Sequence, residues 1–377
     1  MDTFNFYKYL LEKDINFFTG VPDSLLKEFN NVIQKNTPSQ NHHITSNEGS
    51  AIALATGYNL ATRKIPLVYL QNSGFGNMIN PLMSLTSDKV YSIPMLIIVG
   101  WRGEPGIKDE PQHLSQGECM VDLINSLKIP FNILSNNIDD SKKIIDSTIE
   151  SIKLTSKPHI ILVKKNTFQK YSNKINIINN YPIYRKEAIE HVVNFFNKDI
   201  ILSTTGKISR ELLETINEKK LPQDNIFLNV GAMGHVSMIS LGIAMNTKKR
   251  VICLDGDGSV LMHMGNLTSV GTSNCSNLIH IVLNNGMHES VGIQPTKGFD
   301  INISEIARKC GYSYSIVIDK EDQISNIFNY INSNKLDGPI LVEIRINNKV
   351  NYSHELARPK DLPIERKNKF INSIDID

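Results

Sequence analysis

The stretch LDGDGSVLMHMGNLTSVGTSNCSNLIHIVLNNG, residues 254–286, places groups that can do chemistry directly after two apolar runs. Asp-Gly-Asp-Gly follows the first run and Asn-Asn-Gly follows the second. Asp257 offers a carboxylate and Asn285 an amide oxygen, and Mg²⁺ prefers such hard ligands. Gly256 and Gly258 would let the backbone approach a diphosphate at the N-terminus of the next helix. The two polar tips therefore predict a site for a magnesium-bound diphosphate.

The same residues have two plainer interpretations. Residues 255–259 alternate acidic and small residues as a calcium loop does, but an EF-hand needs Gly at its sixth position and Glu at its twelfth. Val260 and Asn266 occupy those positions, which excludes the EF-hand. An ordinary turn after a strand stays open, because Asp, Gly and Asn are common turn residues.

Short β-branched runs alternate with longer helical patterns along the whole chain, which is typical of parallel sheets built from βαβ units. Five expected strands in the first half recur in the second half at offsets of about 180–185 residues; they start near residues 15 and 200, 44 and 227, 67 and 251, 95 and 279, and 160 and 340. We therefore expect an α/β protein with two doubly wound parallel-sheet domains, residues 1–168 and 185–377. The polar, Asn-rich residues 169–184 are the expected linker.

Composition excludes several other classes of protein. With 40 basic and 38 acidic residues the formal net charge is +2, so we expect no nucleic-acid partner. The four cysteines have no C-x-x-C spacing, which argues against a disulfide framework, a zinc knuckle or an iron–sulfur cluster. Neither a signal peptide nor a membrane span is expected, and we expect a cytoplasmic protein with no membrane partner.

The spacing of the two polar tips resembles the signature of thiamine diphosphate enzymes, in which Gly-Asp-Gly precedes Asn-Asn by about thirty positions. Here 25 residues separate Gly258 from Asn284. The resemblance implies the thiamine diphosphate-binding fold, with thiamine diphosphate and Mg²⁺ as cofactors. It implies that Asp257, Asn285 and the main-chain carbonyl of Met287 hold the magnesium.

The same resemblance implies a set of residues around the organic cofactor. Gly231 would receive the aminopyrimidine amine through its carbonyl, and Met233 would wedge under the thiazolium ring, although an ordinary core methionine is an equal alternative. The implied cofactor-binding residues are Glu48, Thr205, Gly206, Gly231, Met233, Gly256, Gly258 and Ser259.

Glu48, in HITSNEGSAIALATGY, matches the glutamate that such enzymes need from the other domain type. A carboxyl group facing N1′ of the pyrimidine favours the imino tautomer, whose nitrogen can take the proton from thiazolium C2. The alternative is a carboxylate in the first turn of a helix, stabilised by the helix dipole. The resemblance also implies a homodimer or higher homo-oligomer with active sites at the subunit interface.

The order of the two domains resembles that of 2-oxo acid decarboxylases. Several stretches look closest to the compact phosphonopyruvate decarboxylases: GVPDSLLKEF, QNSGFGNMINPL, GWRGEPGIKDEPQH, STTGKISREL and NNGMHESVGIQPT. The implied substrate is phosphonopyruvate, a small 2-oxo acid. Sulfopyruvate decarboxylases are the nearest alternative, and a carboligase of the acetolactate type, which normally has a third domain, is a more distant one.

A substrate with two anionic groups needs cations and proton-transfer groups near the cofactor. Arg102 and Lys108 lie in a Gly- and Pro-rich stretch that is typical of a mobile loop closing over an anion, although a solvated surface loop is the alternative. Lys297 is a weaker candidate for the same task. By resemblance Asp23 and His113 are implied catalytic residues; alternatively, Asp23 caps the following helix and His113 lies on the surface.

Overall fold

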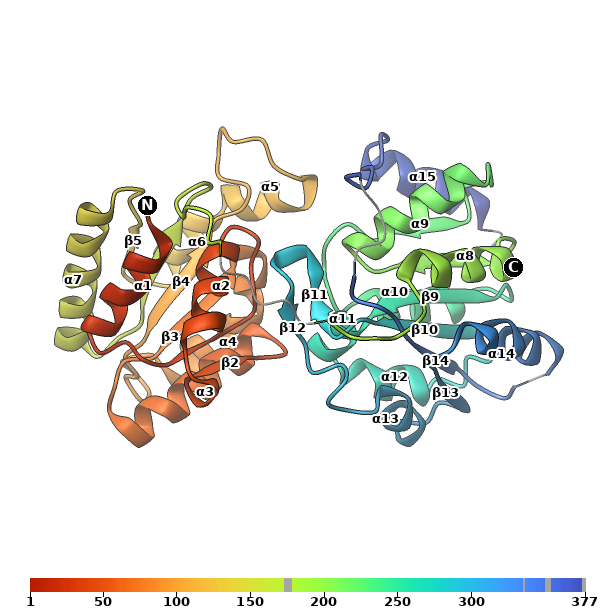
Figure 1. Cartoon of the computed structure of the whole chain (residues 1–377), viewed down its shortest axis with the longest axis horizontal. Coiled ribbons are helices and arrows are strands. Elements are labelled where there is room, and N and C mark those ends of the chain that lie inside the picture. The colour runs from red at the N-terminus through yellow and green to blue at the C-terminus, as the bar shows by residue number, and fades with distance from the viewer. Residues whose placement is uncertain (173–177, 335, 350–353, 375–377) are drawn as a thin grey trace. The chain divides into compact units, whose positions relative to one another are not determined.

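The computed structural model describes most of the chain, namely residues 1–172, 178–334, 336–349 and 354–374. By its contacts the chain divides into two compact units. The first comprises Met1–Asn176 with His288–Gln294, and the second comprises Ile177–Met287 and Pro295–Asp377. Each unit holds a six-stranded parallel sheet with helices on both faces, which confirms the expected α/β class (Figure 1).

Part of the expected linker, residues 173–177, lies outside the described residues. The domain boundaries at residues 168 and 185 therefore stay predictions. Among the residues that are described, no helix is both long and apolar enough to cross a bilayer.

The first unit supplies strands β1 to β6 and helices α1 to α7. The strands are β1 (Phe18–Gly20), β2 (His42–Ile44), β3 (Leu67–Gln71), β4 (Leu96–Gly100), β5 (Phe131–Ile133) and β6 (His159–Val163). The α-helices are α1 (Thr3–Glu12), α2 (Lys27–Asn36), α3 (Glu48–Thr62), α4 (Phe75–Leu85), α5 (Pro111–Glu118), α6 (Met120–Ser126) and α7 (Ile138–Thr155). Two 3₁₀ turns, η1 (Ser39–Asn41) and η2 (Asn72–Gly74), complete it.

The second unit repeats this plan with strands β7 to β10, β13 and β14. These strands are β7 (Ile200–Ser203), β8 (Ile226–Leu228), β9 (Val251–Gly256), β10 (Leu278–Asn284), β13 (Tyr314–Ile318) and β14 (Ile340–Arg345). The helices are α8 (Arg185–Phe196), α9 (Lys207–Glu218), α10 (Val236–Ala244), α11 (Asp257–Met262), α12 (Asn266–Gly271), α13 (Ile303–Lys309), α14 (Glu321–Ser333) and α15 (Pro363–Ser373). Along the chain β10 is followed by a small ribbon of β11 (Met287–His288) and β12 (Gln294–Pro295), with η3 (Glu289–Val291) between them; most of this ribbon, His288–Gln294, belongs to the first unit by its contacts.

The two sheets have the same strand order. The first runs β2-β1-β3-β4-β6-β5, and the second, taken from its opposite end, runs β8-β7-β9-β10-β14-β13. All ten expected strands are present, although β2 ends at Ile44, where the expected strand began. Within the two six-stranded sheets, the strands not predicted are β5 and β13, which are equivalent edge strands with mostly half-buried side chains, so neither forms a continuous apolar run.

Strand residues alternate between the two faces of each sheet, and both faces are buried. On β3, Leu67 and Tyr69 pack with α1, α2 and α7, whereas Val68 and Leu70 pack with α3, α4 and α6. On β9, Ile252 and Leu254 pack with α8, α9 and α14, whereas Val251 and Cys253 pack with α10, α12 and α13. These cores fix the sheets, so each strand tip is a rigid support for the residues that follow it.

The packing of α7 gives a matched test of this core. Ile152 is fully buried and Leu154, two residues further on, is 85% exposed. We expect Ile152→Ala to lower the free energy of unfolding by about 2–5 kcal/mol through lost burial and a residual cavity. The control Leu154→Ala should change it by less than about 0.5 kcal/mol. Chemical denaturation followed by circular dichroism measures both, and equal effects would contradict this assignment of faces.

Candidate active site

The two polar tips predicted to bind magnesium lie side by side in the second unit. Gly256, the last residue of β9, pairs with Leu283 of β10, so Asp257 and Asn285 follow neighbouring strand ends. The Asp257 carboxylate accepts hydrogen bonds from the main-chain amide of Asn285 and from the hydroxyl of Thr296. The Asn285 side-chain oxygen accepts from the main-chain amide of Met287 at 3.1 Å. The structure thus brings together the three residues predicted as metal ligands.

Burial of Asp257 shapes its chemistry. The residue is 2% exposed, and desolvation raises the pKa of its carboxyl to about 6 despite the donors around it. A divalent cation beside this carboxylate would offset the cost of burying its charge. The donor set of carboxylate, amide oxygen and main-chain carbonyl therefore fits Mg²⁺.

Several residues with no predicted role complete this tip. Asn284 donates to the Gly298 carbonyl at 2.8 Å and to Glu343 Oε1 at 2.9 Å. A Cβ on Gly298 would lie 2.6 Å from both Asn284 Oδ1 and Asp257 Oδ2, so only glycine permits this approach. Thr296 and Gly298 flank Lys297 in QPTKGF, and no pattern in the sequence reveals that this segment folds over Asp257.

Residues predicted to meet the diphosphate also lie close together. Ser259 Oγ accepts from Thr204 Oγ1 at 3.1 Å and from the Gly234 amide at 3.1 Å. Thr205 Oγ1 accepts from the Gly231 amide at 3.1 Å. The tip of β7, the loop after β8 and the start of α11 are therefore joined by hydrogen bonds.

The loop after β8 has an unusual backbone. Gly231, Ala232 and Gly234 have φ values of 121°, 44° and 88° respectively. Such values strain a residue that carries a Cβ, so the surrounding hydrogen bonds must hold Ala232 in place. Met233 is half-buried, so it is neither as buried as an ordinary core methionine nor as exposed as a surface side chain. Gly206, with φ 97°, precedes α9.

Glu48 is the first residue of α3 and is only 4% exposed. Its Oε2 accepts from the Asn77 side chain at 2.8 Å, and desolvation raises its pKa. A Cβ on Gly74 would lie 1.9 Å from Glu48 Oε1, so this glycine makes room for the carboxyl. The alternative, a carboxylate stabilised by the helix dipole, agrees with the position of Glu48 in the first turn of α3. It gives no reason for the burial of this side chain. Asn77 and Gly74 were not predicted, although both lie in the quoted stretch QNSGFGNMINPL.

Asp23 follows β1 and is fully buried. Its Oδ2 accepts from the amides of Leu25 and Leu26 at 3.1 and 3.2 Å, so the capping alternative describes real hydrogen bonds, made in the turn before α2. Desolvation raises the pKa of Asp23 to about 6, although Arg102 opposes the shift. A Cβ on Gly100 would lie 1.9 Å from Asp23 Oδ2, so a glycine again faces a buried carboxyl.

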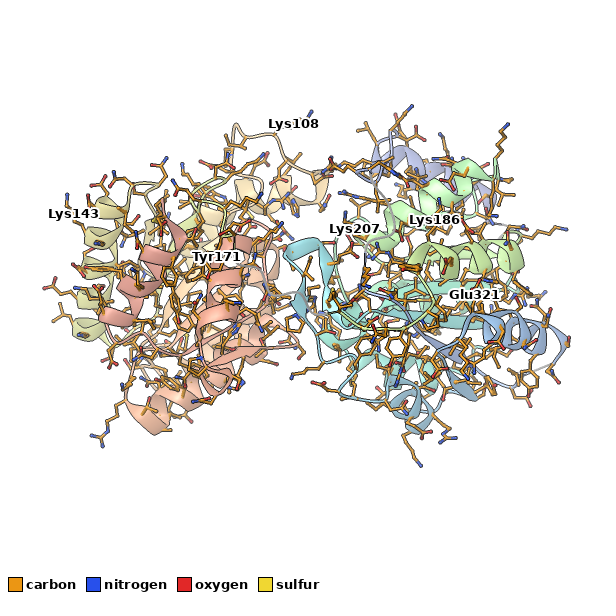
Figure 2. All side chains as sticks on the ribbon, viewed as in Figure 1. Lys108, Lys143, Tyr171, Lys186, Lys207 and Glu321 are labelled. Carbon is orange, nitrogen blue, oxygen red and sulfur yellow. The ribbon has the colours of Figure 1, made fainter. Side chains whose placement is uncertain are left out.

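The loop after β4 brings Arg102 and His113 together. Both contact the carboxylate of Asp109, and His113 is 9% exposed, which excludes a surface histidine. Lys108, in contrast, is exposed on its loop (Figure 2). Lys297 is exposed in the second unit and pairs with Asp300 at 3.0 Å. The structure therefore groups Asp23, Arg102 and His113 but not the two predicted lysines.

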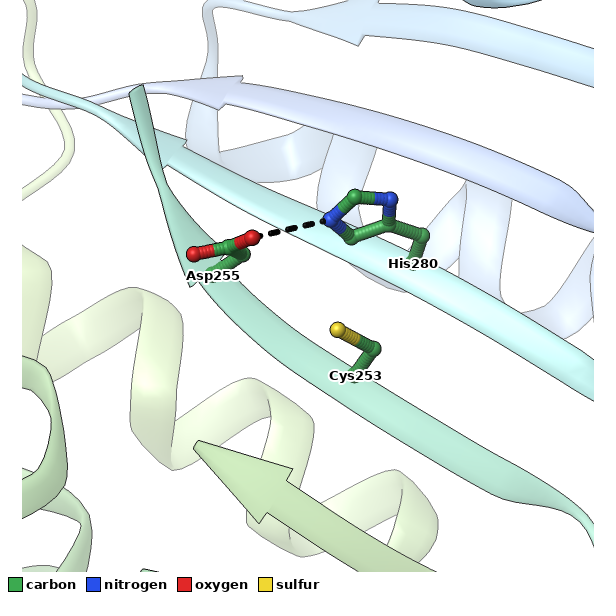
Figure 3. Close-up of side chains that lie close together, drawn as sticks. All are labelled: Cys253, Asp255 and His280. Carbon is green, nitrogen blue, oxygen red and sulfur yellow. Dashed lines mark hydrogen bonds and ion pairs between the residues drawn. The ribbon is translucent and has the colours of Figure 1, made fainter. Parts of the chain in front are cut away.

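One buried cluster lies outside the predicted set. His280 Nε2 lies 3.3 Å from Asp255 Oδ2 (Figure 3). Its Nδ1 lies 3.0 Å from the Tyr312 hydroxyl. Cys253 Sγ faces the same pair, with its potential ligand atom within 4.8 Å of theirs. The cluster packs between β9 and β10 and anchors the strand end that precedes Asp257.

Comparisons with known proteins match each of the two units to a family. The family described as "Thiamine pyrophosphate enzyme, N-terminal TPP binding domain" matches residues 4–125, and "Thiamine pyrophosphate enzyme, C-terminal TPP binding domain" matches residues 206–344. Glu48 lies within the first match and Asp257 within the second.

Three curated relatives cover most of the chain. Phosphonopyruvate decarboxylase of Streptomyces viridochromogenes is 32% identical over 93% of this chain and 89% of its own length. That of Streptomyces hygroscopicus is 31% identical over 93% and 88%. Sulfopyruvate decarboxylase of Methanosarcina acetivorans is 25% identical over 83% and 84%.

Gly74 and Gly76 give a matched test of the space around Glu48. An added Cβ would strike the Glu48 carboxyl at Gly74 but meet nothing within 4 Å at Gly76. We expect Gly74→Ala to displace the carboxyl and lower the free energy of unfolding by about 1–3 kcal/mol. Gly76→Ala, in α4, should be neutral or stabilising by up to about 1 kcal/mol. Denaturation curves and a crystal structure of each variant measure this; an unmoved Glu48 in Gly74→Ala would contradict it.

Proposed function

This chain belongs to the thiamine pyrophosphate enzyme family, and we propose that it decarboxylates 3-phosphonopyruvate to phosphonoacetaldehyde and carbon dioxide. The main support is that two phosphonopyruvate decarboxylases each match 93% of the chain at above 30% identity. The sulfopyruvate decarboxylase matches less of the chain at lower identity, which makes a sulfonate the second candidate.

The second unit supplies residues suited to the charged end of the cofactor. We propose that Asp257, Asn285 and the Met287 carbonyl hold Mg²⁺, because the first two are joined at one strand edge and Asn285 bonds Met287. Thiamine diphosphate, when bound, supplies the carbon nucleophile and the electron sink for loss of carbon dioxide. The proposed contacts to its diphosphate and rings come from Thr205, Gly206, Gly231, Met233, Gly256, Gly258 and Ser259.

Glu48 is the proposed proton-transfer group for the cofactor. Its raised pKa allows it to hold a proton closer to neutral pH than an exposed glutamate does. Its Oε2 accepts from Asn77, and its Oε1 lies on the side of Gly74.

Asp23 and His113 are the proposed proton-transfer groups for the substrate. Their pKa values shift toward each other, because burial raises that of Asp23 to about 6 and lowers that of His113. The Asp23 carboxyl can therefore hold a proton closer to neutral pH than an exposed aspartate does, and the neutral His113 ring can accept one. Arg102 and Lys108 are the proposed cations for the carboxylate and phosphonate, with Lys297 as a weaker candidate.

We also propose that the protein works as a homodimer or larger homo-oligomer with active sites at the subunit interface. The support is that Glu48 and Asp257 belong to separate units of like topology, so each unit offers only half of the predicted set.

A substrate assay tests the proposed reaction. We expect the protein with thiamine diphosphate and Mg²⁺ to release carbon dioxide from phosphonopyruvate, with kcat/KM at least about tenfold above that for sulfopyruvate or pyruvate, because phosphonate carries more charge than sulfonate for the cations to bind. Carbon dioxide and aldehyde are followed separately. Activity on sulfopyruvate alone would overturn the substrate, and no activity on any 2-oxo acid would overturn the reaction.

The matched control for this assay is Glu48→Ala. It should abolish turnover but retain the diphosphate, because the proposed diphosphate contacts come from the second unit. Turnover at the normal rate by this variant would contradict the proposed role of Glu48.

The pKa of Asp257 predicts how metal binding depends on pH. Asp257 can bind the cation only when its carboxyl group is ionised. Affinity for the cation should therefore be constant well above pH 6 and fall by roughly tenfold per pH unit below it. Electron paramagnetic resonance titration with Mn²⁺ in place of Mg²⁺, with thiamine diphosphate present, measures this after correction for metal bound by free cofactor. Asp257→Asn should bind more weakly and lose the step near pH 6. An unchanged profile in this variant would contradict the assignment.

A further inference from the structure

The carboxylate of Asp109 accepts hydrogen bonds from several groups in its loop. The Arg102 guanidinium grips both oxygens, with Nε 2.8 Å from Oδ2 and a terminal nitrogen on Oδ1. The amides of Gly103 and Glu110 donate at 2.9 and 2.7 Å. The side chain is only 12% exposed, so these are not the weak contacts of a surface ion pair.

A fifth donor to the same carboxylate is the ring of His113. Its Nδ1 lies 3.1 Å from Asp109 Oδ1, and its Nε2 lies 3.1 Å from the side-chain nitrogen of Gln71. An ionised carboxylate accepts only, so Nδ1 must bear the hydrogen that is donated. In the neutral ring Nε2 is then an acceptor, and the Gln71 amide donates to it. Asp109 therefore selects one tautomer of His113, as carboxylates that orient catalytic histidines do.

Arg102 is also tied to the other predicted groups. Its second terminal nitrogen donates to Ser24 Oγ at 2.6 Å, next to Asp23. Its main chain exchanges two hydrogen bonds with the Asn72 side chain, at 2.8 and 3.1 Å. Asn72 opens η2, whose last residue, Gly74, faces the Glu48 carboxyl. The Asp109 carboxylate thus holds the Arg102 guanidinium, which adjoins Asp23 and is connected through η2 to Glu48.

We propose that Asp109 is a positioning residue, which aligns Arg102 for the anionic substrate and fixes the His113 tautomer for proton transfer. This proposal rests on the proposed decarboxylation for its catalytic part, while its structural part can be tested without any substrate.

The charges around His113 give the sign of the expected effect. The groups that face the ring are Asp109, Arg102 and Glu110, with Gln71 neutral. Burial lowers the pKa of His113 and Arg102 lowers it further, whereas Asp109 and Glu110 oppose both. Replacing Asp109 by a neutral side chain of equal size should therefore lower the pKa of His113 further.

Nuclear magnetic resonance of the full chain with ¹⁵N-labelled histidine tests the structural part. The variants are Asp109→Asn and the control Asp122→Asn, an exposed carboxylate on α6; His113→Gln assigns the signal among the ten histidines. We expect Asp109→Asn to lower the pKa of His113 and to lose the single Nδ1–H tautomer, and the control to change neither. Unchanged tautomer and pKa in Asp109→Asn would overturn the proposal.

Steady-state kinetics with phosphonopyruvate tests the catalytic part. Asp109→Asn should raise KM through the released Arg102 and lower kcat through His113, for a loss of more than tenfold in kcat/KM, with the acidic limb of the pH profile displaced. Asp109→Glu should recover part of the loss. A changed His113 signal with unchanged kcat/KM and pH profile would overturn positioning for catalysis.

The two proposals fail in different ways. If the unaltered protein does not decarboxylate phosphonopyruvate, the proposed function fails, and with it the catalytic part of this inference. The histidine signals would still decide whether Asp109 fixes the tautomer.

Discussion

Three carboxyl groups are buried at the carboxyl ends of parallel strands, and a glycine faces each one. Glu48 follows β2 with Gly74 against it, Asp23 follows β1 with Gly100 against it, and Asp257 follows β9 with Gly298 against it. Each carboxyl is 4% exposed or less. Desolvation raises the pKa of all three, because a buried charge lacks the solvation that water provides. The proposed chemistry depends on this constraint, since groups with ordinary pKa values would neither hold protons near neutral pH nor gain as much from a bound cation.

The same strand order serves two different purposes in the two units. In the first, the strand ends carry the buried carboxyl groups proposed to transfer protons, with amide and guanidinium partners such as Asn77 for Glu48 and Arg102 near Asp23. In the second, the strand ends carry the oxygen atoms proposed to bind the metal, together with main-chain amides such as those around Asp257 and Ser259. In the proposed function, a repeated scaffold would thus present acid–base groups from one copy and anion- and cation-binding groups from the other, because function depends on the site and not on the fold.

Much of this arrangement follows from local sequence, and the remainder depends on contacts between distant segments. Most of the ten expected strands are predictable because they are apolar runs buried on both faces, whereas the half-buried edge strands β5 and β13 are not. Asp257 and Asn285 are predictable because neighbouring parallel strands end at one edge. Asp109 contacts Arg102 only because the loop after β4 turns back on itself. The hydrogen bond from Thr296 to Asp257 joins residues that are 39 positions apart. No periodicity or motif encodes either contact.

The loop after β4 is anchored at its base, so it cannot swing as a whole. Trp101 donates from its main chain to Val163 and from its ring to the Gly117 carbonyl, and a Cβ on Gly117 would lie 1.9 Å from the Gly103 carbonyl oxygen. Residues 105–108, by contrast, are all exposed, and Gly106 has open space around it. A rearrangement that leaves these contacts intact would therefore move Lys108 through solvent, while Arg102 keeps its hydrogen bonds to Asn72 and Ser24. In the proposed function, an anion would then be bound by an Arg102 guanidinium that stays in place and a Lys108 ammonium that moves. A change in the length of the segment around residues 105–108 would affect only the position of Lys108.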